Sequence, residues 1–375
     1  MRAFVFTDRA LAKHAGQFVW LSIDTEKAGN ASFVQRYPIR AWPSFYVIDP
    51  VHETIALRWV GGATTSQLEK ILADGARAVR GRSGLEEAFA RADRLYGEGK
   101  YGEAAPAYRD ALGSLSPKAP QYARVVESLL FSLQSTRDRA GCVSLARQAL
   151  PSLRNSASAA NLAGSGLDCA LALPPDASGR AEAIAAFEED ARAVLANRAV
   201  RIAADDRSAL YGSLVSARED AKDSDGARRV AGGWVADLDA EADRVKTAEQ
   251  HTALDPNRLG AYEAAGEIER AIPMLERSER EFPGDYNPPA RLAYVYLKLK
   301  RYDDAFAASR RALERVYGPR RIRVLTTLAD IQKGCGDAPA AKTTLQDAIA
   351  FAESLPAGQR SEETIASLKK KLELF

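Results

Sequence analysis

Residues 85–117 read LEEAFARADRLYGEGKYGEAAPAYRDALGSLSP, and this stretch decides how most of the chain should fold. Two amphipathic segments flank the turn-forming run GEGKY, which predicts two helices joined by a tight turn. Ala92, Ala104 and Ala111 follow one another at intervals of 12 and 7 residues. Because protein interiors are close-packed, only small side chains fit where two helices cross closely. We therefore predict that these alanines lie at helix crossings.

The same two intervals recur towards the C-terminus. They separate the alanines in two further sets, Ala293, Ala305 and Ala312, then Ala329, Ala341 and Ala348. Ala271 precedes Ala305 by 34 residues, and Pro117 and Pro283 stand near the ends of their units. A 34-residue period with small residues at fixed places resembles the tetratricopeptide repeat. The resemblance is strongest at 85–117 and 252–353 and looser between 120 and 250.

The tetratricopeptide resemblance implies an α-solenoid over residues 85–375, with roughly eight hairpins at this period. Such hairpins stack into a superhelix with a concave groove, and in the family that groove binds extended peptides or partner helices. We therefore expect a protein or peptide partner in the repeat groove. The alternative is a helical bundle without repeats. The basic stretch SRRALERVYGPRRIR at 309–323 either attracts acidic partners or forms solvated helix faces.

The first eighty residues have a different pattern. FVWLSID at 18–24, SFYVID at 44–49 and TIALRWVGG at 54–62 are rich in β-branched and aromatic residues, which predicts three buried strands. The last two should form an antiparallel hairpin. Residues 30–37 and 64–80 are predicted helices, the second with an apolar stripe.

This order of elements, with the motifs FVWLSIDTE, RYPIRAWPSFYVID and WVGG, resembles thioredoxin over residues 1–80. In thioredoxins the proline after the turn has a cis peptide bond, and an extended substrate pairs with the backbone before it. The resemblance places this proline at Pro43 and implies a substrate-binding loop of Trp42, Pro43 and Ser44. The alternative is an ordinary turn proline beside an aromatic residue.

One departure from thioredoxin concerns the chemistry, because no cysteine precedes Cys142. The family's C-x-x-C motif opens its first long helix, and the resemblance places the start of this chain inside that helix. We expect the motif upstream of Met1 if the start is drawn too late; the other explanation is a genuine fragment. The chain as given thus has no predicted catalytic residue. It is an enzyme, a protein-disulfide oxidoreductase, only if such an extension exists.

The remaining composition narrows the function classes. Cys142, Cys169 and Cys335 are far apart, which suggests neither a disulfide framework nor a zinc site and predicts small buried side chains. The three histidines are scattered, so we predict no metal and no cofactor. The net charge of +2 gives no bias towards nucleic acid. No apolar run reaches the roughly 18–20 residues of a membrane helix, so no membrane insertion is expected.

Together these patterns predict an α/β plus all-α protein, a partial thioredoxin-like domain at 1–80 followed by a tetratricopeptide-repeat domain at 85–375. The expected function is a protein–protein interaction scaffold derived from a thiol-disulfide oxidoreductase. The alternative is a redox-silent adaptor that binds a partner peptide in the groove. The compartment stays open: cytoplasmic as written, periplasmic or secreted if a leader precedes Met1.

Overall fold

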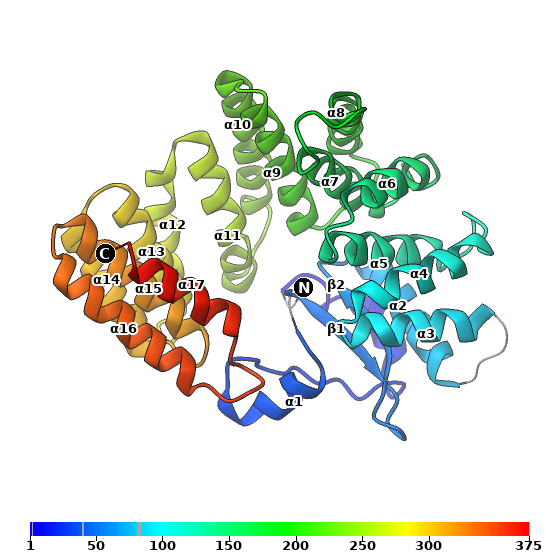
Figure 1. The fold of residues 1–375 in the computed structure, drawn as a ribbon, viewed down its shortest axis with the longest axis horizontal. Helices are drawn as coiled ribbons and strands as arrows, with labels where there is room; N and C mark the ends of the chain where they lie inside the picture. Colours follow the sequence, from blue (N-terminus) through cyan, green and yellow to red (C-terminus); the bar gives the residue numbers. More distant parts are fainter. Residues whose placement is uncertain (2, 40, 81–84, 375) are drawn as a thin grey trace. The chain divides into compact units, whose positions relative to one another are not determined.

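The chain folds into two compact units in a computed structural model that describes residues 1, 3–39, 41–80 and 85–374. Unit 1 comprises Met1–Phe18 and Ile39–Ala240, and unit 2 comprises Val19–Pro38 and Glu241–Phe375. The chain therefore passes between the units at three points. Figure 1 shows the elements of both units along the chain.

Unit 1 contains a β-hairpin followed by helices. Its elements are η1 (Arg9–His14), β1 (Ser44–Ile48), β2 (Ile55–Val60), α2 (Thr65–Arg80), α3 (Leu85–Gly97), α4 (Tyr101–Gly113), α5 (Tyr122–Ser135), α6 (Arg139–Leu153), α7 (Ser158–Leu171), α8 (Arg180–Ala196), α9 (Ala204–Asp220) and α10 (Ser224–Ala242), which ends just past the unit boundary.

Unit 2 combines a short N-terminal segment with the C-terminal helices. Its elements are η2 (Ala28–Asn30), α1 (Ala31–Arg36), α11 (Ala248–Ala265), η3 (Ile268–Arg270), α12 (Ala271–Glu281), α13 (Asn287–Lys298), α14 (Tyr302–Arg315), α15 (Arg320–Gly334), α16 (Ala338–Ser354) and α17 (Glu362–Leu372).

The predicted β-hairpin is confirmed. β1 and β2 pair antiparallel, with Ser44 opposite Val60. The predicted helix at 64–80 is confirmed as α2, and Thr64 begins it as a cap: its hydroxyl accepts a hydrogen bond from the backbone N–H of Gln67 at 3.2 Å. The predicted helix at 30–37 is confirmed as α1.

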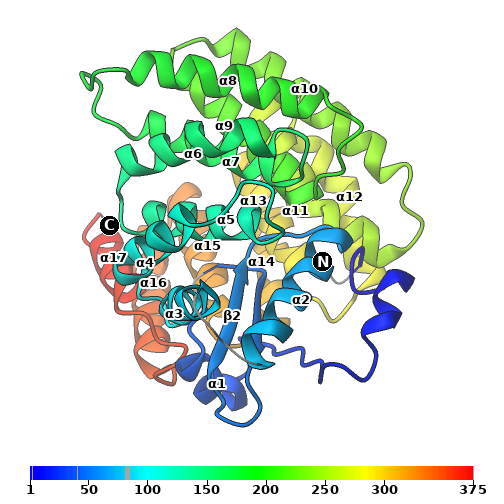
Figure 2. The same ribbon diagram turned by 90° about the vertical axis from the view of Figure 1, so that its right-hand side faces the viewer.

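Buried charges attach the hairpin and α2 to the helices that follow. Arg58 of β2 is completely buried and donates to the Tyr101 hydroxyl at 2.9 Å. Arg124 of α5 donates to Asp74 of α2 at 2.8 Å and to Asp93 of α3 at 2.6 Å. Figure 2 shows β2 beside α2 and α3. These elements thus share one core with the first helical pair.

The predicted strand at 18–24 is wrong. The segment has no regular structure, and Val19 and Leu21 are 88% and 71% exposed. A strand needs a neighbouring strand to pair its backbone groups, and the sheet of the described residues consists only of β1 and β2. In place of the long helix expected at the start, the described residues 1 and 3–18 form turns and η1. A thioredoxin-like domain over residues 1–80 is therefore not confirmed.

The predicted boundary between the domains 1–80 and 85–375 falls on residues 81–84, which lie outside the described residues. That boundary stays a prediction, and the compact units divide the chain at other places.

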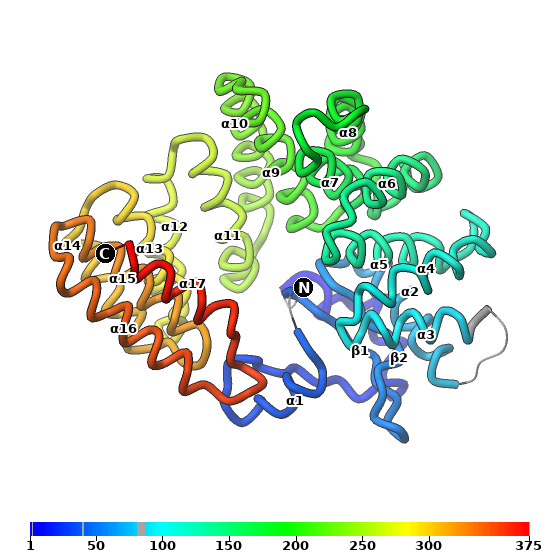
Figure 3. The backbone as a smooth tube through the Cα atoms, in the orientation of Figure 1, coloured from blue at the N-terminus to red at the C-terminus, as the bar shows by residue number. Residues whose placement is uncertain are grey.

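A single turn geometry joins six pairs of helices: α3–α4, α5–α6, α9–α10, α11–α12, α13–α14 and α15–α16. In each turn a left-handed residue is followed by a backbone N–H that donates to the carbonyl five residues earlier, as Arg301 does to Tyr296 at 2.9 Å. The left-handed residues are Gly99, Arg137, Lys222, Gly266, Lys300 and Gly336. The structure is thus built from repeated helical hairpins, as the tetratricopeptide resemblance predicts (Figure 3).

The ten alanines singled out by their spacing all lie on helices, and none is more than 2% exposed. They are Ala92 on α3, Ala104 and Ala111 on α4, Ala271 on α12, Ala293 on α13, Ala305 and Ala312 on α14, Ala329 on α15, and Ala341 and Ala348 on α16.

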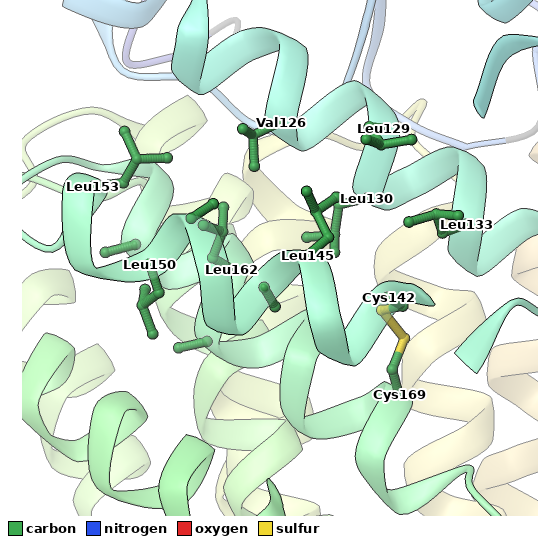
Figure 4. Close-up of a cluster of buried hydrophobic side chains, with 14 of the residues drawn as sticks. Val126, Leu129, Leu130, Leu133, Cys142, Leu145, Leu150, Leu153, Leu162 and Cys169 are labelled. Carbon is green, nitrogen blue, oxygen red and sulfur yellow. A yellow bond between two sulfur atoms is a disulfide. The ribbon is translucent and has the colours of Figure 1, made fainter. Parts of the chain in front are cut away.

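The prediction of three isolated cysteines is wrong. Cys142 of α6 and Cys169 of α7 form a disulfide within the apolar core of unit 1, with their Cα atoms 6.2 Å apart (Figure 4). They stand 27 residues apart in the sequence, but consecutive packed helices bring them together. Both are buried as predicted, whereas Cys335 is exposed.

No helix in the described part of the chain has the length and apolar character needed to cross a membrane.

Candidate functional site

The predicted loop of Trp42, Pro43 and Ser44 lies in unit 1, directly before β1. The Trp42–Pro43 peptide bond is cis, so that prediction is confirmed. The carbonyl of Pro43 accepts a hydrogen bond from the Gly61 N–H at 2.9 Å, which ties the loop to the end of β2. The Ser44 hydroxyl donates to the carbonyl of Ala41 at 2.7 Å. The Trp42 side chain is 56% exposed, and a role for the loop in substrate binding stays a prediction.

The structure brings together a different site in unit 2, between residues far apart in the sequence. Residues 19–38, which we call the strap, lie against the loops that precede α15 and α17, and Figure 1 shows α1 of the strap beside the loop that leads into α17. The side chains that hold the strap form the strap site, which consists of Tyr286, Tyr317, Arg320 and Gln359.

Two acidic side chains of the strap carry its polar contacts. The Glu26 carboxylate accepts from Arg320 Nε at 2.9 Å and from the Tyr286 hydroxyl at 3.2 Å. The Asp24 carboxylate accepts from the Tyr317 hydroxyl at 2.6 Å. Hydrogen bonds to charged groups are roughly twice as strong as neutral ones. The site therefore binds two carboxylates placed two residues apart in the strap.

The backbone of the strap is held as well as its side chains. Gln359 Nε2 donates to the carbonyls of Thr25 and Lys27, both at 2.9 Å. Within the strap, the Asp24 carboxylate accepts from the Glu26 N–H at 2.9 Å, and Asn30 Nδ2 donates to the Asp24 carbonyl at 2.8 Å. These internal bonds fix the turn that presents both carboxylates.

Two glycines allow the strap to approach closely. A Cβ atom at Gly318 would overlap the carbonyl oxygen of Glu26, and one at Gly358 would overlap the carbonyl oxygen of Ala31. Gly318 also has a φ of 56°, in the left-handed region that favours glycine. The strap backbone thus lies directly against the backbones of both loops.

The protonation states suit this arrangement. Burial of Asp24 favours a higher pKa, but the hydrogen bonds from Tyr317 and from the Glu26 N–H outweigh it and lower the pKa. Burial and the Glu26 charge raise the pKa of Tyr286 to about 12, and the hydrogen bond to Asp24 raises that of Tyr317 to about 12. At neutral pH the aspartate is therefore an anionic acceptor and both tyrosines are donors.

Sequence reasoning missed the strap site, although one signal pointed to part of it. Tyr317, Gly318 and Arg320 lie within the basic stretch 309–323, for which an acidic partner was one interpretation. Two other arginines of that stretch have a different partner: Arg311 and Arg315 pair with Glu279 of α12 at 2.8 and 2.9 Å. Nothing local to residues 19–38 indicates that they fold with residues 241–375.

The remaining kind of functional site is a metal site. Across the ranges that the structure describes, no three His, Cys, Asp or Glu side chains converge as a metal site requires.

Comparison with known proteins yields structural likenesses alone. No protein-family model matches the chain, and no curated protein sequence matches it. A tetratricopeptide repeat protein from Parabacteroides merdae is similar at 13% identity, with a TM-score of 0.47, over 77% of this chain and 98% of that one.

Two further solved structures are similar over comparable lengths. The TPR2AB domain of yeast Sti1 in complex with pHSP90 has 15% identity and a TM-score of 0.29, over 77% of this chain and 98% of that one. The assembly chaperone of RpL4, Acl4, has 14% identity and a TM-score of 0.36, over 78% and 98%. Likenesses this distant do not indicate a function, and the repeats are seen in the recurring turns and helix pairs of the chain itself.

Proposed function

We propose that this protein is an interaction scaffold whose C-terminal repeats bind an extended acidic peptide segment of a partner protein at the strap site. One observation carries the proposal: the repeats already hold such a segment, residues 24–27, through side chains suited to that purpose. Arg320 and the two tyrosines bind its carboxylates, and Gln359 binds its backbone.

The contacts define what a partner must offer. It needs carboxylates at two positions separated by one residue, because Asp24 and Glu26 are bound by different donors. It needs a backbone that presents two carbonyls to one amide, as Thr25 and Lys27 do. It also needs little bulk opposite Gly318 and Gly358. The partner sequence is therefore of the form acidic–any–acidic within an irregular, extended segment.

In this proposal the strap is an internal competitor. It occupies the strap site of its own chain, so a partner peptide binds only when the strap is displaced. The apparent affinity of the peptide is then its intrinsic affinity multiplied by the fraction of molecules whose strap site is free. The concave groove expected from the tetratricopeptide resemblance stays a separate prediction.

The oxidoreductase hypothesis has less support. Thiol–disulfide exchange needs access to the sulfur that is attacked, and Cys142 and Cys169 are at most 1% exposed. No cysteine stands near Pro43 in the sequence.

A peptide-binding measurement tests the scaffold proposal. The probe is a labelled peptide, LSIDTEKAGN, which copies residues 21–30 and stops before the residue that Gly358 contacts. Gly358→Ala should displace the strap because its new methyl group overlaps Ala31. We expect the full-length Gly358→Ala protein to bind the peptide at least about tenfold more tightly than the wild type, a difference of about 1.4 kcal/mol. Fluorescence anisotropy measures both affinities.

Matched variants separate this result from a general disturbance. Gly284→Ala adds a methyl group in another loop of unit 2, where no atom lies within 4 Å of it. This variant should behave like the wild type. Adding Arg320→Ala to Gly358→Ala should abolish the gain, and a peptide with Asn and Gln in place of its Asp and Glu should not bind. Equal binding of the neutral peptide, or no gain with Gly358→Ala, would overturn the proposal.

A further inference from the structure

A second polar site lies within unit 2, between α11 and α12, and shares no residue with the strap site. It is a pocket of about 260 Å³, and six of its lining side chains are polar or charged. From α11 these are His251, Asp255 and Arg258, and from η3 and α12 they are Arg270, Arg277 and Ser278.

The deepest part of the pocket is a buried hydrogen-bond pair. Asp255 and Ser278 are only 1% and 2% exposed, and the Ser278 hydroxyl donates to Asp255 Oδ2 at 2.7 Å. Thr252 donates to the same hydroxyl oxygen at 3.1 Å. This pair joins α11 to α12 and satisfies the aspartate, so the arginines determine the charge near the entrance.

Two of the three arginines are positioned by one aromatic ring. Arg258 donates to the Tyr262 hydroxyl at 2.8 Å, and the Arg270 guanidinium lies over the Tyr262 ring at 4.6 Å. The third, Arg277, is held by Glu281 at 3.0 Å, and Arg270 also pairs with Glu267 at 2.6 Å. Both glutamates lie outside the pocket lining, and each offsets part of the charge of its arginine. Both pairs are exposed to water, where an ion pair contributes little to stability, so an anion of higher charge can replace the glutamates.

The lining of the pocket holds more cationic than anionic side chains. Three guanidinium groups and a single carboxyl line it, and burial raises the pKa of that carboxyl, Asp255, to about 6. Burial and the nearby Arg277 lower the pKa of His251, so that imidazole is neutral at pH 7. A concave site with an excess of arginine attracts anions.

The remaining wall is less polar, because Pro273 and Met274 complete the lining. Ligand pockets typically measure roughly 300–1,000 Å³, so this one suits a small group with a short apolar stem. Arginine binds phosphate through two parallel hydrogen bonds, and a phosphate monoester carries a charge near −2 at neutral pH. That charge matches three guanidinium groups better than a single carboxylate does.

We propose that the pocket between α11 and α12 is a binding site for a phosphate monoester, held by Arg258, Arg270 and Arg277 with Pro273 and Met274 against its stem. The ester is either a phosphorylated side chain of a partner or a small phosphorylated molecule. Both sources present the same group to the arginines.

Calorimetric titration of the full-length protein at constant ionic strength tests the proposal, with inorganic phosphate, O-phosphoserine, phenyl phosphate and acetate as probes. We expect saturable one-site binding of at least one of the two esters, and binding weakened at least about tenfold by Arg277→Gln or Arg270→Gln. Tighter binding of phosphoserine indicates a phosphorylated side chain and tighter binding of phenyl phosphate a small aromatic ester; either order supports the site.

The control is Arg280→Gln, which removes an exposed arginine of the same helix that does not line the pocket, and it should leave the affinity unchanged. Arg320→Ala, which disrupts the strap site, should also leave it unchanged, so the two proposals fail separately. Acetate binding as tight as that of the esters, absence of saturable ester binding, or an equal loss with Arg280→Gln would overturn the inference.

Discussion

Units 1 and 2 are built from the same helical hairpin, yet charged residues stabilise them in different ways. In unit 1, Arg124 lies between Asp74 and Asp93, and all three side chains are at most 8% exposed. In unit 2, Arg311 pairs with Glu279 from a position where 40% of its side chain is exposed. The first ion pair lies inside the core of its unit, and the second lies at the surface of its unit.

The difference matters because water screens the second kind of pair and not the first. Removing one partner of a buried ion pair leaves an uncompensated charge in a medium that solvates it poorly. Removing one partner of an exposed pair costs little because water replaces it. Unit 1 should therefore be sensitive to the loss of Arg124, and unit 2 should tolerate the loss of Arg311.

The largest expected effect comes from Arg124→Ala. It leaves Asp74 and Asp93 buried without their cation, which should lower the free energy of unfolding by roughly 3–5 kcal/mol. Arg311→Ala in unit 2 should cost less than about 1 kcal/mol. Denaturant midpoints followed by circular dichroism measure both, and similar shifts for the two variants would contradict the comparison.

The next largest effect should be a pH dependence of stability, which a buried carboxyl in each unit produces. Burial, then Glu127 and Asp205, raise the pKa of Asp206 in unit 1 to about 7, while Asp255 in unit 2 reaches about 6. Between the unfolded value near 4 and these pKa values, the folded protein holds a proton that the unfolded chain has released. Stability should therefore fall as the pH rises through this window, by an amount on the order of 4 kcal/mol for Asp206.

Two substitutions test this pH dependence. Asp206→Asn should match the wild type near pH 4 and exceed its stability near pH 8, with the difference growing up to about pH 7. For Asp255→Asn the difference should stop growing near pH 6. The measurement is the unfolding midpoint of each protein at one-unit pH steps. If the stability difference between each variant and the wild type stayed constant with pH, the raised pKa values of Asp206 and Asp255 would be refuted.

The disulfide contributes at a similar scale, and it belongs to unit 1. Closing a loop of this length stabilises a protein by about 3.5 kcal/mol in the chain-entropy model. We expect Cys142→Ala to lower the unfolding midpoint and to make it insensitive to reductant. Cys335→Ala, which removes an exposed thiol of unit 2, should do neither. A wild-type midpoint that reductant leaves unchanged would show that this disulfide does not stabilise the fold.

The smallest expected effect tests the alanine spacing itself. Ala305→Leu adds bulk at a completely buried position of α14, which should cost roughly 1–3 kcal/mol through overpacking. Ala307→Leu adds the same bulk on the exposed face of the same helix and should be within about 0.5 kcal/mol of neutral. Thermal unfolding distinguishes them, and equal melting temperatures would mean that helix packing does not require alanine there.

Sequence predicted the features that local spacing determines. The alanines of each hairpin, the β1–β2 pair and α2 all follow from residues within about forty positions of one another. Even so, three of the six hairpin turns use Arg137, Lys222 or Lys300 in the left-handed conformation, where glycine would have been the clearer signal.

The rest depends on contacts between residues far apart in the chain. FVWLSID has the composition of a strand, but composition does not show whether a neighbouring strand is available, and here Val19 and Leu21 are exposed. The pairing of Arg124 with Asp74 joins helices fifty positions apart. The bond between Tyr286 and Glu26 spans 260 positions, so no short pattern could have revealed the strap site.

That separation of 260 positions also has a consequence for biosynthesis. A ribosome adds roughly 5–20 residues per second, so Glu26 is made roughly 13–50 seconds before Tyr286. During this interval the nascent chain carries the acidic segment of the strap, next to the apolar run Val19–Leu21. The residues of the strap site that bind this segment have not yet been made. Unit 2 can therefore complete its folding only after residues 241–375 have been made, when its first and last segments coexist.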